Sequence, residues 1–174
     1  MTSLHFAQIS DIHFSSLGSH HELLSDHAPD ILAGIIADLN QLADLDFVLI
    51  TGDLFDVADQ YEFDQFQAGI KSLDKPYYII PGNHDRRTLD RTEGLTRRDF
   101  ARHFNPQFDQ RPTAPEAQSG YWSIAVDPQV QIIGLDSIRD ADWGGVIDDA
   151  QWRWLEQELA AHADKFVIVA VHHP

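Results

Sequence analysis

The sequence predicts an α/β layered fold, because apolar runs of strand length alternate with helical patterns along the chain. Four of these runs are followed directly by acidic, amide or imidazole side chains, the residue types that serve metal and acid–base chemistry. They are Leu4–Ile9, Phe47–Thr51, Tyr77–Ile80 and Phe166–Val171. A length of 174 residues suits one domain with a substantial core and is short for two. We therefore expect residues 1–174 to form a single domain.

The first half of the chain alternates strand and helix. After the first strand and a polar loop, a helix begins near Pro29, which suits a first helical turn because proline lacks an N–H. One apolar stripe at helical spacing is predicted for it: Ile31, Leu32, Ile35, Ile36, Leu39 and Leu42. A second helix begins near Tyr61 and turns the following side chains to the core: Phe63, Phe66, Ile70 and Leu73. Pro76 ends this connection before the third strand.

The second half is less regular at first. A short amphipathic helix is predicted near Leu95–Phe104, and proline-rich residues 105–119 read as irregular. Strands over 121–126 and 130–135 flank Asp127-Pro128-Gln129, which predicts a hairpin. A loop over 142–149, with Gly144-Gly145 at its centre, precedes a helix over 149–161. We expect that helix to bury Trp152, Leu155 and Leu159, and to lead into the buried strand Phe166–Val171.

The composition of the chain limits the metal ligands and the binding partners that can be expected. The chain has no cysteine, which excludes disulfides and thiolate metal sites and leaves His, Asp, Glu and Asn as ligands for Mn, Fe, Zn, Co or Mg. No apolar run reaches membrane-spanning length, and no basic leader precedes Leu4–Ile9, so we expect a cytoplasmic protein without a membrane partner. A net charge of −16 argues against binding to long nucleic acids.

The arginines are concentrated in one stretch of the acidic chain. Two interpretations stay open: a solvated helix face with local ion pairs, or a positive rim beside the site that attracts a phosphate ester. The stretch begins directly after Asp85 and contains Arg86, Arg87, Arg91, Arg97, Arg98, Arg102 and Arg111.

Four short motifs carry the candidate chemistry. Open α/β sheets bind ligands beyond the carboxyl ends of their strands, and all four motifs lie there, which suggests one site at one edge of one sheet. Each motif alone is weak, since an aspartate such as Asp53 can equally serve as a turn residue or a helix N-cap. Together they favour a metal site. The motifs are Asp11-Ile12-His13, Gly52-Asp53, Gly82-Asn83-His84-Asp85 and His172-His173.

This series of D-x-H, G-D, G-N-H-D and H-H-P resembles the calcineurin-like metallophosphoesterase superfamily. The resemblance is to the branch with class III cyclic-nucleotide phosphodiesterases and bacterial glycerophosphodiesterases. It implies a four-layer α/β/β/α sandwich and two divalent or trivalent metal ions, namely Mn, Fe, Zn or Co. By position, Asp11 and His13 would hold one ion, Asp53 would bridge, and Asn83 and His172 would hold the other.

The resemblance also implies catalytic and substrate-binding roles. His84 would contact the phosphate and help protonate the leaving alkoxide, and Asp56, which completes G-D-x-x-D, would orient His84. Asn83, His84 and His173 are the expected substrate-binding residues. The remaining histidines are expected to be non-ligands (His5, His103, His162) or to lie in a mobile loop (His20, His21, His27).

The chain departs from the family pattern in one respect. The family has a Gly-His-x-His motif downstream of His-His-Pro, and this sequence contains none. We therefore expect a fold that lacks its carboxyl-terminal part, three protein ligands per metal, and an uncovered sheet edge that promotes self-association into homo-oligomers.

The function that follows is hydrolysis of a small phosphodiester, either a cyclic nucleotide or a glycerophosphodiester. The attacking group would be a hydroxide activated by two metal ions. One alternative is a phosphomonoesterase or nuclease of the same superfamily. The other, from a different class, is a catalytically impaired metal-binding fragment.

Overall fold

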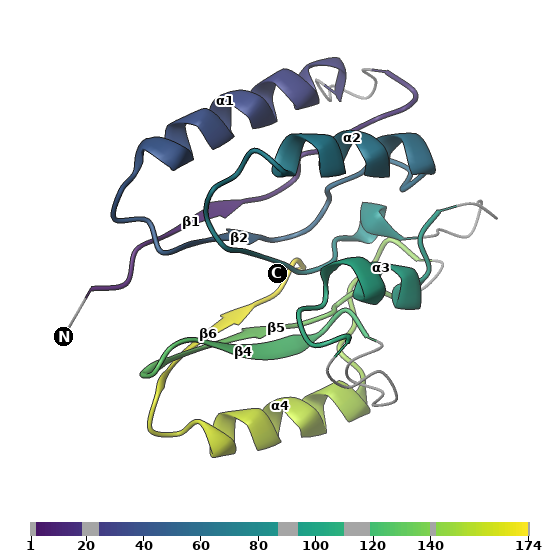
Figure 1. Ribbon diagram of the computed structural model, residues 1–174. Helices are drawn as coiled ribbons and strands as arrows, with labels where there is room; N and C mark the ends of the chain where they lie inside the picture. The colour runs from purple at the N-terminus through teal and green to yellow at the C-terminus, as the bar shows by residue number, and fades with distance from the viewer. Residues whose placement is uncertain (1–2, 19–24, 87–93, 110–118, 140–141, 174) are drawn as a thin grey trace.

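The computed structural model describes residues 3–18, 25–86, 94–109, 119–139 and 142–173. Within these ranges the chain forms four layers, with helices, a sheet, a second sheet and a helix stacked in that order (Figure 1). The expected α/β/β/α sandwich is confirmed. A sheet can bury side chains on both of its faces only if both faces are covered. Here the two sheets cover each other's inner faces, and helices lie over the outer faces (Figure 1).

The first sheet is parallel, in the order β1 (Phe6–Ile9), β2 (Phe47–Ile50) and β3 (Tyr77–Ile79). Helices α1 (Ala28–Gln41) and α2 (Gln60–Ile70) lie over its outer face (Figure 1). Because the strands are parallel, their carboxyl ends meet at one edge.

The second sheet contains an antiparallel pair and a parallel pair. The predicted hairpin joins β4 (Trp122–Asp127) to β5 (Val130–Gly134), and β6 (Phe166–Ala170) pairs parallel to β5. Helix α4 (Asp149–Ala161) forms the fourth layer below this sheet (Figure 1). The remaining elements are α3 (Arg97–Phe104) and the 3₁₀ turns η1 (Ser25–His27) and η2 (Asn83–Asp85).

Strand alternation divides the core between the layers. In β2, Val48 and Ile50 belong to the cluster beneath the helices, whereas Phe47 and Leu49 join Trp122 between the two sheets. The indole Nε1 of Trp122 donates to the carbonyl oxygen of Ile79 (2.8 Å), so the sheets are joined by a hydrogen bond as well as by packing.

Side-chain caps fix where the helices begin. Asp59 accepts the N–H of Glu62 (2.9 Å) at the start of α2, and Asp148 accepts the N–H of Gln151 (2.8 Å) at the start of α4. Among the described residues, no helix combines the length and the hydropathy needed to cross a bilayer.

Several burial predictions were wrong. Trp152 and Leu159 of α4 are 49% and 41% exposed, and only Gln151 and Leu155 are buried on that helix. The helix covers a sheet of three strands, so a narrow stripe suffices. Strand β6 is likewise not a buried strand, because it pairs only with β5 among the described residues and leaves Phe166 69% exposed. Ile31 on α1 and Leu42, the residue after its end, also face solvent and fall off the predicted stripe: they are 49% and 47% exposed.

Candidate metal centre

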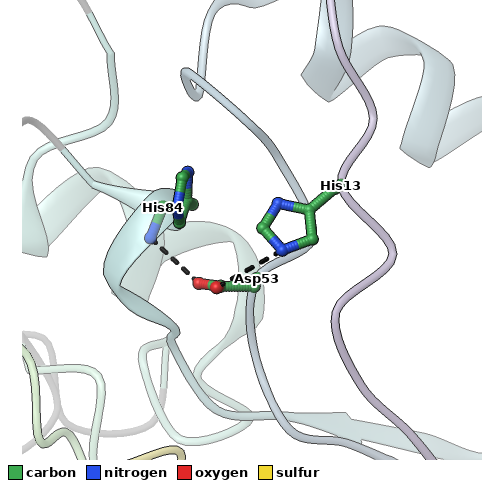
Figure 2. Close-up of side chains that lie close together, drawn as sticks. All are labelled: His13, Asp53 and His84. Carbon is green, nitrogen blue, oxygen red and sulfur yellow. Dashed lines mark hydrogen bonds and ion pairs between the residues drawn. The ribbon is translucent and has the colours of Figure 1, made fainter. Parts of the chain in front are cut away.

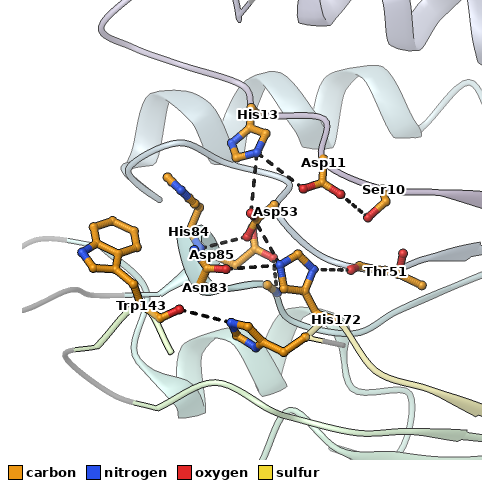
Figure 3. A network of polar contacts seen from close by, with 12 residues as sticks. Ser10, Asp11, His13, Thr51, Asp53, Asn83, His84, Asp85, Trp143 and His172 are labelled. Atoms are coloured by element: carbon orange, nitrogen blue, oxygen red, sulfur yellow. Dashed lines mark hydrogen bonds and ion pairs between the residues drawn. The ribbon is translucent and has the colours of Figure 1, made fainter. Parts of the chain in front are cut away.

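The four predicted motifs converge, but from two sheets rather than from one. The segments after β1, β2 and β3 bring Asp11, His13, Asp53 and Asn83 together, and His172 reaches the same place from the end of β6 (Figure 3). The prediction of a single edge of a single sheet was therefore wrong. Packing the two sheets face to face aligns the end of β6 with the ends of the first sheet.

Three of the converging residues have left-handed backbone conformations. The φ angles are 58° at Asp11, 50° at His13 and 54° at Asp53, all outside the regions that L-residues prefer. Hydrogen bonds between the loops hold them there: the Asp11 N–H donates to Gly52 O and the His13 N–H to Asp53 O, both at 3.0 Å. Non-glycine residues in this region cluster at functional sites, because surrounding structure must compensate for the strain.

Two glycines let the loops approach each other closely. A Cβ atom on Gly82 would lie 2.2 Å from both the backbone N and Oδ1 of Asp53, and one on Gly52 would lie 2.4 Å from the N of Gly82. A side chain at Gly82 would displace Asp53, and one at Gly52 would displace the backbone of Gly82, so both glycines of the motifs are required by geometry.

Asp85 holds the loops of Asp53 and Gly82 together through hydrogen bonds to their backbone N–H groups. Its carboxylate accepts the N–H groups of Leu54 (2.7 Å), Phe55 (3.2 Å) and Gly82 (2.8 Å). Burial raises the pKa of Asp85 to about 8, and the nearby charge of Asp53 adds to the rise while the three hydrogen bonds oppose it. The fourth residue of G-N-H-D thus joins the backbone just after Asp53 to Gly82 of its own motif.

Asp53 lies at the centre of the cluster. Its Oδ2 is 3.6 Å from Nε2 of His13 and 3.6 Å from Nε2 of His172, while its Oδ1 accepts the backbone N–H of His84 at 2.9 Å. Figure 2 shows His13 and His84 on either side of this carboxylate. The side chain is buried, so these charged and polar contacts are shielded from water.

The hydrogen bonds of His172 define its proton position. Its Nδ1 lies 2.7 Å from the carbonyl oxygen of Thr51, which can only accept, so Nδ1 carries the proton. The lone pair of Nε2 then faces Oδ1 of Asn83 (3.2 Å) and Oδ2 of Asp53 (3.6 Å). With the Asn83 amide oriented this way, three acceptor atoms face one another, and a shared cation would satisfy all of them. This arrangement fits a metal ion.

Asp11 and His13 extend the donor set. Nε2 of His13 lies 3.8 Å from Oδ1 of Asp11, and its buried Nδ1 has no hydrogen-bond partner in the described structure. Burial lowers the pKa of His13, against the opposing effect of Asp53, and so favours the neutral imidazole that a metal requires. Asp11 is exposed and accepts a hydrogen bond from the hydroxyl of Ser10.

Two groups of three side chains could each hold a metal ion. They are Asp11, Asp53 and His172, and His13, Asp53 and His84, with ligand atoms within 4.8 Å of one another in each group. Asp53 belongs to both groups, and Asn83 adds an amide oxygen beside the first. Carboxylate, imidazole and amide donors suit borderline and hard cations such as Mn, Fe, Zn and Co.

His84 is oriented by the loop after β2. Its Nδ1 donates to the carbonyl oxygen of Asp56 (2.9 Å), and the Asp56 carboxylate is more distant, with Oδ1 at 3.6 Å. Asp56 is buried, and its Oδ2 accepts the hydroxyl of Ser15 (2.9 Å). The direct contact with His84 therefore uses the backbone of Asp56, while its side chain fixes the loop.

His173 lies beside the cluster and supports a neighbouring loop. Its Nε2 donates to the carbonyl oxygen of Trp143 (3.2 Å), and its Nδ1 accepts from the hydroxyl of Ser137 (2.9 Å). Both ring nitrogens are thus engaged by protein groups. The expected substrate contact of His173 stays a prediction.

The other histidines lie apart from the two groups. His5 contacts Asp44 (2.7 Å), His162 contacts Glu158 (3.5 Å), and His103 packs on the ring of Phe63. His27 lies in η1 at the surface. His20 and His21 fall outside the described residues.

The arginine stretch contains neither a uniformly solvated face nor a uniformly exposed rim. Arg86 is 2% exposed and donates to Oδ2 of Asp136 (3.1 Å) and to Ile138 O (2.5 Å), and Arg97 donates to the same carbonyl (3.0 Å). These two arginines join the G-N-H-D turn and α3 to the segment after β5. Arg98 and Arg102 are exposed, and Arg87, Arg91 and Arg111 lie outside the described residues.

Sequence reasoning missed two residues that shape the centre. Glu62 is completely buried and accepts four backbone N–H groups around the loop that carries Asp56. A glutamate at the third residue of a capped helix is a sequence signal for hydrogen bonding to nearby backbone N–H groups. The sequence does not show which N–H groups Glu62 binds. Trp143, whose ring centroid lies 4.9 Å from that of His84, sits in a glycine-containing loop that gives no such signal.

Comparisons with known proteins identify phosphoesterases as similar to this chain. A family model described as calcineurin-like phosphoesterase matches residues 4–174. A probable glycerophosphodiester phosphodiesterase of Arcobacter nitrofigilis is 34% identical over 173 residues, which cover 96% of this chain and 56% of that protein. A probable cyclic nucleotide phosphodiesterase of Rhodopseudomonas palustris is 28% identical, over 97% of this chain and 57% of its own length.

A more distant relative matches over nearly the whole chain, and a solved structure shares the fold. The 3′,5′-cyclic adenosine monophosphate phosphodiesterase of Escherichia coli K12 is 23% identical over 95% of this chain and 54% of its own. A purple acid phosphatase from yellow lupin superposes with a TM-score of 0.60 at 19% identity, over 97% of this chain and 30% of that one. The chain thus spans about half the length of the curated relatives it matches.

Proposed function

The chain belongs to the calcineurin-like phosphoesterase family, and on that premise we propose that it hydrolyses small phosphodiesters with two bound metal ions. The observation that carries the proposal is the convergence of acceptor atoms from Asp53, Asn83 and His172, which a cation would satisfy. Its relatives include proteins named for glycerophosphodiesters and for cyclic nucleotides, and substrates of both kinds fit the proposal.

Each residue of the centre has a proposed part. Asp11 and His13, with Oδ1 and Nε2 3.8 Å apart, would hold one ion, and Asn83 and His172 the other, although Asp11 also lies within reach of His172. Asp53 would serve both ions because its Oδ2 faces both imidazoles. When bound, two such ions lower the pKa of a shared water toward about 7 and neutralise charge on the phosphoryl oxygens. Asn83 and His84 would also contact the phosphoryl group, and His84 would donate a proton to the leaving oxygen.

The hydrogen bonds of His84 support its role as a proton donor. Nδ1 is bound to the Asp56 carbonyl, so Nε2 is the atom that can exchange a proton with substrate. The backbone N–H of His84 is bound to Asp53, which keeps the ring beside the carboxylate at the centre. His84 also belongs to one of the two groups of potential ligands, so its role needs a direct test.

The charge of the chain favours small substrates. A net charge of −16 repels the backbone of a long nucleic acid, whereas a single phosphodiester carries one negative charge that a metal centre can offset. We therefore place small diesters ahead of nucleic acids, and a nuclease or phosphomonoesterase remains the alternative within this family.

A metal-binding module without turnover is the second candidate function. Each group of side chains offers three protein ligands besides Asn83, and fewer ligands mean weaker metal binding and looser geometry. This candidate predicts metal binding without catalysis.

One experiment separates these functions. Hydrolysis of bis(p-nitrophenyl) phosphate is measured with added Mn²⁺ and after chelation, and metal affinity is measured by calorimetry on the same samples. Metal-dependent hydrolysis supports the phosphodiesterase, and faster hydrolysis of p-nitrophenyl phosphate would instead favour a monoesterase. Metal binding without hydrolysis would favour the module.

The variant His84→Ala tests the proton donor within the same experiment. Turnover should fall by about 10²–10⁴-fold, the usual contribution of acid–base catalysis, while metal affinity is retained. A parallel loss of metal would make His84 a ligand instead.

A further inference from the structure

Trp143 places a half-exposed indole beside the candidate proton donor. Its ring centroid is 4.9 Å from that of His84, the two planes are inclined by 47°, and 51% of Trp143 is exposed (Figure 3). The other tryptophans are placed differently: Trp122 is buried between the sheets, Trp154 packs on Tyr121, and Trp152 lies on α4. An indole next to a reactive histidine is available to a substrate.

The loop that carries Trp143 is fixed by several contacts. The carbonyl oxygen of Trp143 accepts from His173 (3.2 Å), and the N–H of Val146 donates to Ser137 O (2.7 Å). Gly145 lies against His173 so closely that a Cβ atom would be 2.7 Å from its Cγ. His173 follows His172 directly, so one strand end supplies both a candidate metal ligand and the support of Trp143.

We propose that Trp143 is a stacking platform for a flat aromatic group, such as a nucleobase, on the leaving-group side of the substrate. The inference rests on the proposed function. If His84 protonates the leaving oxygen, the organic group on that oxygen lies beside His84, where the structure places the exposed indole.

The surroundings favour a flat ring over a cationic group. Cations bind best to cages of several aromatic rings, whereas the described ring contact of the Trp143 indole is with His84 alone. The adjacent carboxylate of Asp142 is already engaged by Arg139 (3.0 Å) and by the N–H of Gly144 (3.0 Å). Stacking needs only one open aromatic face, and every nucleobase offers a partner for it.

Binding of three phosphate monoesters to the Zn²⁺-loaded protein tests the platform by calorimetry. A monoester carries a single organic group, and its ester oxygen can take the leaving-oxygen position beside His84 when the phosphoryl group occupies the centre. Adenosine 5′-monophosphate should bind about tenfold more tightly than ribose 5-phosphate, a gain typical of base stacking on an aromatic residue. Phosphocholine should bind no more tightly than ribose 5-phosphate.

Variants assign the difference to one ring. Trp143→Ala should remove the preference for adenosine 5′-monophosphate, and Trp143→Phe should keep most of it. Phe166→Ala is the matched control, because this ring is 69% exposed at the start of β6, the opposite end of the strand from His172.

The outcomes separate the platform from the proposed function. Equal binding of adenosine 5′-monophosphate and ribose 5-phosphate would overturn the platform and leave the proposed function standing, as would a preference that survives in Trp143→Ala. A preference for phosphocholine would also overturn it, in favour of a cation site. If none of the three monoesters binds, the platform is overturned, and hydrolysis of bis(p-nitrophenyl) phosphate decides the proposed function separately.

Discussion

Nδ1 of His172 lies 2.7 Å from the carbonyl oxygen of Thr51, and this contact joins the end of β6 to the end of β2. It places the proton on Nδ1 and turns the lone pair of Nε2 toward Asp53 and Asn83 (Figure 3). One backbone carbonyl of the first sheet therefore sets the tautomer of a candidate ligand that comes from the second sheet.

Replacing this imidazole should weaken metal binding. His172→Gln removes the nitrogen that faces Asp53, and we expect Mn²⁺ affinity to fall by at least about tenfold in titration calorimetry. His162→Gln is the control, because His162 lies at the end of α4 and its one described ionic contact is with Glu158 (3.5 Å). Equal affinity in the two variants would remove His172 from the centre.

Asp53 should matter more for metal loading than Asp11. Asp53 belongs to both groups of potential ligands, whereas Asp11 belongs to one and is exposed. Asp53→Asn should therefore reduce the occupancy of both ions, and Asp11→Asn should reduce mainly one. Elemental analysis of the metal-loaded proteins gives the stoichiometry. Equal losses in the two variants would contradict a shared carboxylate.

The sequence predicted the elements better than their burial. Strand and helix positions followed from apolar periodicity, and the helix Asp149–Ala161 has the expected bounds. Periodicity does not reveal how wide a surface a helix covers, so Trp152 and Leu159 were wrongly expected in the core. The four-layer arrangement came from family resemblance, because spacing along the chain does not state which strands share a sheet.

The candidate site was predictable where a motif ends a strand. The motifs predict Asp11, His13, Asp53, Asn83 and His172, and the structure brings these side chains together. Residues that act through backbone contacts were not predictable. Glu62 joins the consecutive N–H groups of residues 56–58 to that of Ser16, which is 46 residues away, and the pairing of Arg86 with Asp136 spans 50 residues.

Loss of Arg86 should destabilise the fold through its buried partner. Asp136 is 1% exposed, and Arg86→Met leaves its charge with the longer ionic contact to Arg97 (3.6 Å) and with the backbone N–H groups of Gly120 (3.2 Å) and Ile138 (3.0 Å). Breaking a buried pair typically costs about 3–5 kcal/mol, and we expect a loss near the lower value in urea unfolding. Arg98→Met, on the exposed face of α3, should change stability by no more than about 0.5 kcal/mol. Similar values for both variants would contradict a structural role for the pair.

The outer edge of β6 should promote self-association. Among the described residues β6 pairs only with β5, and Phe166 and Val169 are 69% and 44% exposed on it. Unpaired strand edges with apolar side chains pair with other chains, and a lysine discourages this. Sedimentation velocity should show oligomers that Val169→Lys reduces and that Ala160→Lys, on exposed α4, does not. A monomeric parent protein at the same concentration would contradict the prediction.

Glu62 should control both stability and its dependence on pH. Its carboxylate accepts N–H groups from Ser16 (2.9 Å), Asp56 (3.2 Å), Val57 (2.9 Å) and Ala58 (2.8 Å). Glu62→Gln turns an NH₂ group toward some of these donors, and each unsatisfied buried donor costs about 1–3 kcal/mol. Glu156→Gln, exposed on α4, is the control and should have little effect in urea unfolding.

The pH dependence follows from the direction of the shift. Burial raises the pKa of Glu62 above its ordinary value of 4.5, although its backbone hydrogen bonds oppose the rise. Between 4.5 and the raised folded value, the folded state binds more protons than the unfolded state, so this group's contribution to stability falls as pH rises. Glutamine does not titrate. The difference in unfolding free energy between the parent and Glu62→Gln should therefore be largest below pH 4.5 and shrink through the folded pKa. A difference that grows with pH would show that the four hydrogen bonds outweigh burial and hold the carboxylate ionised.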